Sequence, residues 1–136
     1  AVWSQLIDTS GTSHEQARRL LFLLFPGEVA ESFYRQFGDI VAAARARLSN
    51  GLVRRQAAAM DAWHRKGIGS RLRELCVPVL IATGCEDIVI PSSNALKLAF
   101  AIRGAWLAQF PGAGHAFMAQ YPRALADLIN YFLAIE

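Results

Sequence analysis

Two residues with acid–base side chains follow two apolar runs of the chain. Asp87 lies three residues past the run of residues 79–84, and His115 lies five residues past the run of residues 105–110. If these runs are neighbouring parallel strands, their carboxyl ends lie ~5 Å apart, which makes a carboxylate–imidazole hydrogen bond feasible. Such a carboxylate fixes the imidazole tautomer and stabilises the imidazolium, so that the other ring nitrogen is free to take a proton from a nucleophile.

The elements around this pair alternate between strand and helix. The runs 79–84 and 105–110 are too short for helices and read as strands buried on both faces. A helix is expected over residues 94–101, with Ser92 or Ser93 as its N-cap. Pro122 opens a last helix. This alternation predicts an α/β fold with a parallel sheet, whose sites lie beyond the carboxyl ends of the strands.

The first half of the chain is expected to be helical apart from its start. Residues 2–7 read as a short strand that ends in a turn over residues 8–11. Ser13 and Gln16 have the spacing of a capping box, in which each side chain bonds the other residue's backbone N–H. Apolar stripes then predict a helix from Ser13 to the Pro26-Gly27 stop and three further helices, over 28–37, about 40–48 and about 53–65. The expected divisions are a first core strand in 1–11, a helical insertion in 12–74 and an α/β core in 75–136.

Two segments of the chain resemble the C-terminal half of α/β hydrolases. They read VPVLIATGCEDIVIP over residues 77–91 and PGAGHAF over residues 111–117, followed by Tyr121-Pro122. In that family the acid follows the seventh strand in a Gly-x-x-Asp-x-x-x-Pro context, and the base follows the eighth strand in a Gly-His context. The resemblance implies a partial α/β-hydrolase fold with about three parallel strands, in which Val2–Ile7 is the sixth strand and residues 12–74 form the helical cap.

The resemblance also implies roles for individual residues. Asp87 would be the catalytic acid of the triad and His115 the base, in an esterase-like or lipase-like hydrolase. Phe117 and Met118 follow the His loop and are the expected substrate contacts. In some family members the acid follows the sixth strand instead, and Asp8 occupies that position as the weaker alternative.

The family's nucleophile is not recognised in these 136 residues. Neither a Gly-x-Ser-x-Gly elbow nor an oxyanion-hole loop is found. The serines considered as replacements have strand, turn, cap or helix-start contexts instead: Ser4, Ser10, Ser13, Ser92 and Ser93. A base and an acid without a nucleophile lack the covalent step, so the chain alone is expected to be inactive.

Composition narrows the classes of partner and the cellular settings that we expect for the chain. Residues 14–74 hold eleven Arg/Lys and six Asp/Glu, but the basic residues are not interleaved with aromatic residues, so no nucleic-acid partner is expected. The longest apolar run, residues 20–25, is too short to cross a membrane, and the first residues do not have the pattern of a signal peptide. Cys76 and Cys85 lack the spacing of a disulfide framework or a metal site, which favours free thiols and predicts no metal ion. Free thiols fit a cytoplasmic setting. No cofactor is expected.

The expected partners follow from the partial fold. The completed enzyme would act on a small-molecule, ester-like substrate. An unpaired strand at residues 2–7 and uncovered apolar surface predict self-association or pairing with an N-terminal half. The alternative function is a non-catalytic binding or interaction module that retains this half of the fold.

Overall fold

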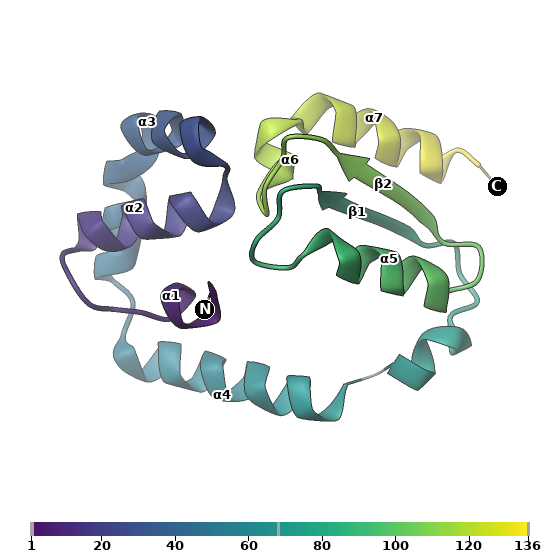
Figure 1. The fold of residues 1–136 in the computed structure, drawn as a ribbon, viewed down its shortest axis with the longest axis horizontal. Helices are drawn as coiled ribbons and strands as arrows, with labels where there is room; N and C mark the ends of the chain where they lie inside the picture. The colour runs from purple at the N-terminus through teal and green to yellow at the C-terminus, as the bar shows by residue number, and fades with distance from the viewer. Residues whose placement is uncertain (1, 68, 136) are drawn as a thin grey trace. The chain divides into compact units, whose positions relative to one another are not determined.

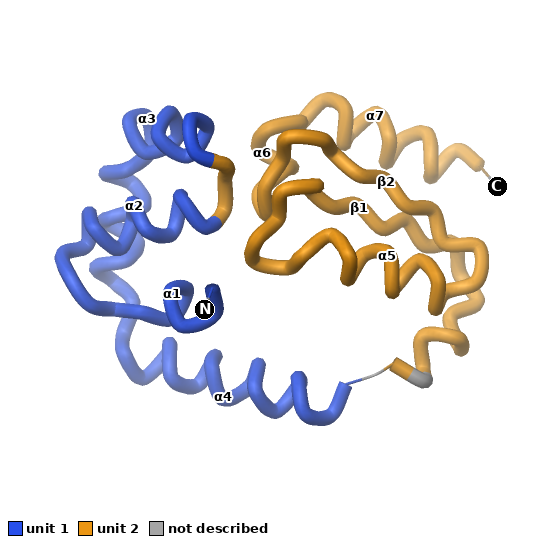
Figure 2. The backbone as a smooth tube through the Cα atoms, viewed as in Figure 1, with its two compact units in different colours: residues 1–23, 27–68 blue, residues 24–26, 69–136 orange. Residues whose placement is uncertain are grey.

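The chain divides into two compact units in the computed structural model, which describes residues 2–67 and 69–135. One unit comprises residues 1–23 and 27–68, and the other comprises residues 24–26 and 69–136 (Figure 2). The short segment 24–26 therefore belongs with the C-terminal unit, although the helices on either side of it belong to the N-terminal unit. Each unit is described separately below.

The C-terminal unit contains the predicted parallel strands. β1 spans Leu80–Gly84 and β2 spans Trp106–Phe110, with Leu80 opposite Trp106 and Gly84 opposite Phe110. The connection between them carries α5, Ser92–Ala101, which contacts both strands. The 3₁₀ helix η1, Gly69–Glu74, precedes β1, and the helices α6, Phe117–Gln120, and α7, Pro122–Leu133, follow β2. Figure 1 shows the strand pair lying between α5 and α7.

The core of this unit lies at the carboxyl end of β2. Phe110 and Phe117 stack with their ring centroids 5.0 Å apart, and Ala113 is fully buried beside them. Leu125 and Leu128 of α7 pack against this cluster. At the other end of β2, the Trp106 ring contacts two aromatic rings of α7, those of Tyr131 and Phe132. The apolar stripe of α7 thus holds the helix along β2.

The N-terminal unit consists of four helices. They are α1, Val2–Leu6; α2, Ser13–Leu24; α3, Gly27–Ala46; and α4, Asn50–Lys66. The predicted helical character of residues 13–66 is confirmed in outline, and α4 ends at Lys66 with Gly67 as its C-cap, one residue past the predicted end at about residue 65. The predicted break near residue 38 is wrong, because Gly38 continues α3 and packs against the Tyr34 ring, where a Cβ atom would lie 3.0 Å from the ring.

The prediction of a strand at residues 2–7 is wrong, because Val2–Leu6 form a helix. The sheet therefore has two strands in the described part of the chain instead of about three. A short apolar run fits both the helix period and the strand period. Trp3 and Ile7 have the i, i+4 spacing of a helix, and the Ile7 N–H donates to the Trp3 carbonyl. A helix satisfies its backbone groups locally, whereas a strand needs a neighbouring strand to do so.

Two predicted helix caps are also corrected. The capping box at the start of α2 uses Thr12 and Glu15, one residue earlier than the predicted pair: the Thr12 N–H donates to Glu15 Oε2, and the Glu15 N–H donates to Thr12 Oγ1. Pro91 stands at the N-cap of α5, so neither Ser92 nor Ser93 caps that helix. Both errors are shifts of one or two residues, the usual uncertainty of helix ends.

Candidate active site

Asp87 and His115 are hydrogen-bonded to each other in the C-terminal unit. His115 Nδ1 lies 2.8 Å from Asp87 Oδ2. The two side chains come from the loops after β1 and β2, at the carboxyl ends of the parallel strands. The spatial pairing predicted from the sequence is therefore present, although the two residues are 28 positions apart.

The Asp87 carboxylate is held in place on both oxygens. Its Oδ1 accepts the backbone N–H groups of Val89 and Ile90, each at 2.8 Å, while Oδ2 faces the imidazole. Only 6% of the Asp87 side chain is exposed, compared with 34% of the His115 side chain. A buried carboxylate without partners would be costly, so these three hydrogen bonds explain how Asp87 remains buried and fixed in orientation.

The loop that carries His115 depends on glycine at close approaches. A Cβ atom on Gly84 would lie 2.3 Å from the carbonyl oxygens of Ala113 and Gly114, and a Cβ atom on Gly114 would lie 2.6 Å from the Leu24 carbonyl oxygen. Gly112 adopts a φ of 67°, which favours glycine. The end of β1 and the His115 loop can therefore pack backbone to backbone.

Sequence reasoning missed two supports of this loop. The Leu24 carbonyl, at the end of α2, accepts the Ala116 N–H at 3.0 Å. The Gln120 side chain bonds two backbone groups of the loop, those of Gly112 and Gly114. The contact with residue 24 is long-range and has no local sequence signal. The loop bonds of Gln120 span only six and eight residues, but a glutamine near a helix end is too common to indicate them.

The paired geometry favours one tautomer of His115. A carboxylate at Nδ1 favours a proton on that nitrogen, which leaves the Nε2 lone pair as a proton acceptor. No other described residue forms a hydrogen bond to Nε2. Such an imidazole can accept a proton from a nucleophile at Nε2, while Asp87 stabilises the resulting positive charge.

The two expected substrate contacts have different environments. Phe117 is buried and stacks on Phe110, so its ring is part of the core. The Met118 side chain is about half exposed. Of the two residues, Met118 alone has a side chain accessible for contact with a ligand.

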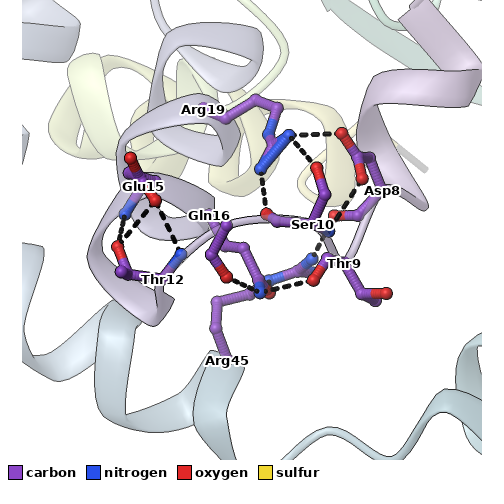
Figure 3. Close-up of polar contacts among 9 residues, drawn as sticks. Asp8, Thr9, Ser10, Thr12, Glu15, Gln16, Arg19 and Arg45 are labelled. Carbon is purple, nitrogen blue, oxygen red and sulfur yellow. Dashed lines mark hydrogen bonds and ion pairs between the residues drawn. The ribbon is translucent and has the colours of Figure 1, made fainter.

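The alternative acid, Asp8, lies in the N-terminal unit and has a different partner. It forms an ion pair with the Arg19 guanidinium, and its Oδ1 accepts the Ser10 N–H at 2.8 Å (Figure 3). Arg19 also donates to the Ser10 carbonyl, and Arg45 donates to the Asp8 carbonyl. The hydrogen bond from the Ser10 N–H is the largest cause of a lowered pKa for the Asp8 carboxyl, and Arg19 adds to the effect. Asp8 therefore orders a turn.

A hollow of about 440 Å³ lies beside this turn and contains no acid–base pair with an imidazole. Five residues line it: Ser10, Gly11, Glu15, Arg18 and Arg19. Its charged groups are already paired, since Arg19 bonds Asp8, Arg18 bonds Glu31, and Glu15 caps α2. The hollow is therefore a gap between satisfied groups and not a candidate catalytic site.

The other side chains considered in the sequence occupy structural positions. Ser10 belongs to the Asp8 turn, and Ser13, Ser92 and Ser93 lie in the first turns of α2 and α5. Ser4 lies in α1 instead of a strand. His14 lies 3.9 Å from Asp39 on an exposed surface, where both side chains are more than half exposed.

Over residues 2–67 and 69–135, no group of three or more His, Cys, Asp or Glu side chains is placed to hold a metal ion. No helix in the same ranges combines the length and apolar character needed to cross a membrane.

Solved structures with the same arrangement of elements were found by structural comparison. A serine hydrolase involved in carbazole degradation, the CarC enzyme, aligns with a TM-score of 0.66 at 22% identity, covering 95% of this chain and 49% of that one. An N-acyl homoserine lactone degrading enzyme aligns with a TM-score of 0.64 at 25% identity, covering 88% and 47%. A mutant of a meta-cleavage product hydrolase, CumD, aligns with a TM-score of 0.62 at 22% identity, covering 91% and 46%.

These likenesses establish the fold. The chain has the C-terminal portion of an α/β-hydrolase fold, and it spans about half the length of the solved structures that it matches. Neither a protein-family model nor a curated protein sequence matches it.

Proposed function

We propose that this chain supplies the acid Asp87 and the base His115 of an α/β hydrolase that cleaves an ester or a related bond. The observation that carries the proposal is the 2.8 Å contact between Asp87 Oδ2 and His115 Nδ1, with Nε2 free of partners in the described structure. The matched solved structures include hydrolases, which supports a hydrolytic reaction.

In the proposed reaction His115 accepts and returns a proton twice, first the proton of the nucleophile and then a proton of water. Nε2 takes the proton of a nucleophilic side chain as that side chain attacks the substrate carbonyl, and then delivers it to the departing alkoxide. A water molecule next attacks the covalent intermediate, again losing its proton to Nε2, and the nucleophile is released with a proton from His115. Asp87 holds the imidazole and stabilises its positive charge throughout.

The nucleophile and the oxyanion donors would come from a second portion of the fold. The matched enzymes are about twice as long as this chain, and Ser13, Ser92 and Ser93 lie in the first turns of helices. We propose that the chain acts together with that second portion, either in one polypeptide or as a partner. The helices of the N-terminal unit would serve as the cap that selects the substrate.

Apolar exposure in the C-terminal unit supports such an association. Within residues 2–67 and 69–135, each strand of the two-stranded sheet pairs along one edge. Large apolar side chains more than 35% exposed are numerous in this unit: Leu75, Val77, Ile88, Ile90, Leu96, Leu98, Phe100, Trp106, Met118, Tyr121, Ile129, Tyr131, Leu133 and Ile135. Strand edges and apolar surface of this extent favour association. In sedimentation we expect the isolated chain to self-associate, and a monodisperse monomer would contradict this expectation.

Hydrolysis of p-nitrophenyl acetate tests the proposed chemistry. We expect no rate from the isolated chain above that of its His115→Ala variant. In a longer protein that includes the coding sequence upstream of Ala1, we expect a rate that falls at least about 10³-fold in His115→Ala. His14→Ala is the matched control, because His14 lies on an exposed surface, and it should retain the parent rate.

Two outcomes would overturn the proposal. One is a longer protein whose hydrolysis rate is unchanged by His115→Ala. The other is an upstream coding sequence without a nucleophile elbow, together with no partner protein that restores hydrolysis, which would favour the non-catalytic module instead.

A further inference from the structure

The Gln120 side chain closes the loop that precedes His115. Gln120 is the last residue of α6, and its amide reaches back to two groups of that loop. Its Oε1 accepts the Gly114 N–H at 2.9 Å, and its Nε2 donates to the Gly112 carbonyl at 3.2 Å. The residue after Gly114 is His115, so the amide lies one peptide away from the imidazole-bearing residue.

This loop has considerable conformational freedom without such a brace. Gly112 adopts a positive φ, and glycine at two of the three positions before His115 gives the backbone many alternatives. Beside the amide, the Tyr121 hydroxyl donates to the Pro111 carbonyl at 2.9 Å. Gln120 and Tyr121, at the junction of α6 and α7, thus bond the loop backbone at three positions: Pro111, Gly112 and Gly114.

We propose that Gln120 is a positioning residue that holds His115 in register with Asp87. The inference rests on the proposed function, because it concerns the same acid–base pair. Gln120 acts through the Gly112–Gly114 backbone, since its side chain bonds Gly112 and Gly114 and has no hydrogen bond to Asp87 or His115. It therefore sets the geometry without taking part in proton transfer.

The chemistry of the site explains why an amide fits this position. The loop presents one donor, the Gly114 N–H, and one acceptor, the Gly112 carbonyl, and a glutamine amide matches both. An ionised glutamate accepts hydrogen bonds only, so it can keep the bond to Gly114 but not the bond to Gly112. Methionine has a similar length and replaces neither bond.

The Nδ1 proton of His115 reports this geometry directly. In NMR spectra of the full chain we expect a downfield Nδ1 proton resonance, assigned by its loss in Asp87→Asn. Gln120→Met should raise the exchange rate of this proton with water roughly 30-fold, the ratio expected when two ordinary hydrogen bonds are lost. Gln120→Glu should lie between Met and the parent. Gln109→Ala, at an exposed glutamine of β2, is the matched control and should behave as the parent.

The outcomes separate this inference from the proposed function. A parent-like resonance and exchange rate in Gln120→Met, with circular dichroism unchanged, would overturn the positioning role while the Asp87–His115 pair stands. If Gln120→Met fails to fold, Gln120→Glu decides: faster exchange supports the role, and exchange equal to the parent refutes it. A parent that shows no Asp87-dependent resonance lacks the pair itself, which would refute both proposals.

Discussion

Each unit of the molecule contains an aspartate that pairs with a basic side chain, and the two pairs differ in what they can do. Asp87 in the C-terminal unit pairs with an imidazole, whereas Asp8 in the N-terminal unit pairs with a guanidinium. A guanidinium stays protonated at any ordinary pH, so the Asp8–Arg19 pair cannot pass a proton. An imidazole can accept a proton at one ring nitrogen and release it again, so the Asp87–His115 pair can pass a proton.

The two aspartates also differ in burial and in the groups that hold them. Asp87 is 6% exposed and held by two backbone N–H groups, while Asp8 is 37% exposed and orders its own turn. Both residues follow a segment that reads as a strand, and the family resemblance allows either as the acid. The partner and the burial of a carboxylate, more than its place in the sequence, therefore indicate its role.

The largest difference between the pairs is expected in catalysis. In the longer protein, Asp87→Asn should lower kcat for p-nitrophenyl acetate by roughly 10³–10⁴-fold, because an asparagine no longer holds the required tautomer or stabilises the imidazolium. Asp8→Asn should change kcat less than about twofold, because its pair lies outside the proton path. Equal losses of kcat in Asp87→Asn and Asp8→Asn would contradict the different roles of the two pairs.

A second difference concerns the glycines of the two units. Gly84→Ala should destabilise the chain by about 1–3 kcal/mol, because the new methyl group would meet two backbone oxygens at 2.3 Å. Gly51→Ala, at the start of α4 with nothing within 4 Å, should stabilise it by roughly 0.5–1 kcal/mol. Urea unfolding measures both, and a tolerated Gly84→Ala would contradict the close packing of β1 on the His115 loop.

A smaller effect is expected at the capping box of α2. Thr12→Ala should cost roughly 1 kcal/mol, because it removes the side-chain acceptor of the Glu15 N–H. Ser13→Ala is the matched control and should cost less, since the structure assigns the cap to Thr12. Thermal unfolding of the two variants compares them, and the reverse order would restore the Ser13–Gln16 box predicted from the sequence.

The smallest expected effect is an acid dependence confined to the N-terminal unit. Backbone N–H groups of Ser10 and Thr12 are the largest causes of the lowered pKa values of Asp8 and Glu15, whose ordinary values are 3.8 and 4.5. The folded chain binds fewer protons at these groups, so their contribution is complete above about pH 4.5 and is lost as the pH falls through the folded pKa values.

Variants at these two carboxyls test that dependence. Asp8→Asn together with Glu15→Gln should lower stability at neutral pH and make unfolding less steep in pH below about 4.5. Helical circular dichroism followed from pH 6 to pH 2 provides the measurement, and Asp61→Asn on α4 is a control without this expectation. If unfolding of the double variant depended on acid pH as steeply as unfolding of the parent, the cause assigned to these pKa values would be contradicted.

The C-terminal unit could be predicted closely from the sequence because its signals are local and mutually consistent. Two short apolar runs, a helix between them and polar residues after each run lead to one arrangement, which the β1–β2 pair and the Asp87–His115 contact confirm. The supports of the His115 loop were not predicted, because the contact of Ala116 with Leu24 joins residues far apart in sequence.

The N-terminal unit was predicted less well for a physical reason. Residues 2–7 fit both a strand and a helix period, and the choice depends on whether a neighbouring strand is present to pair with them. The capping box of α2 was misplaced by one residue because Thr12-Ser13 and Glu15-Gln16 offer two adjacent versions of the same motif. The predicted division into helices over 28–37 and about 40–48 is absent, because Gly38 lies within the continuous helix α3, beside the Tyr34 ring.

The central claim is that His115, held by Asp87, activates a nucleophile outside these 136 residues. Pre-steady-state release of p-nitrophenol from p-nitrophenyl acetate by the longer protein tests it most directly, because a burst reports formation of the covalent intermediate. We predict a burst in the parent whose rate falls at least about 10³-fold in His115→Ala. A burst of the same rate in both proteins would contradict the claim.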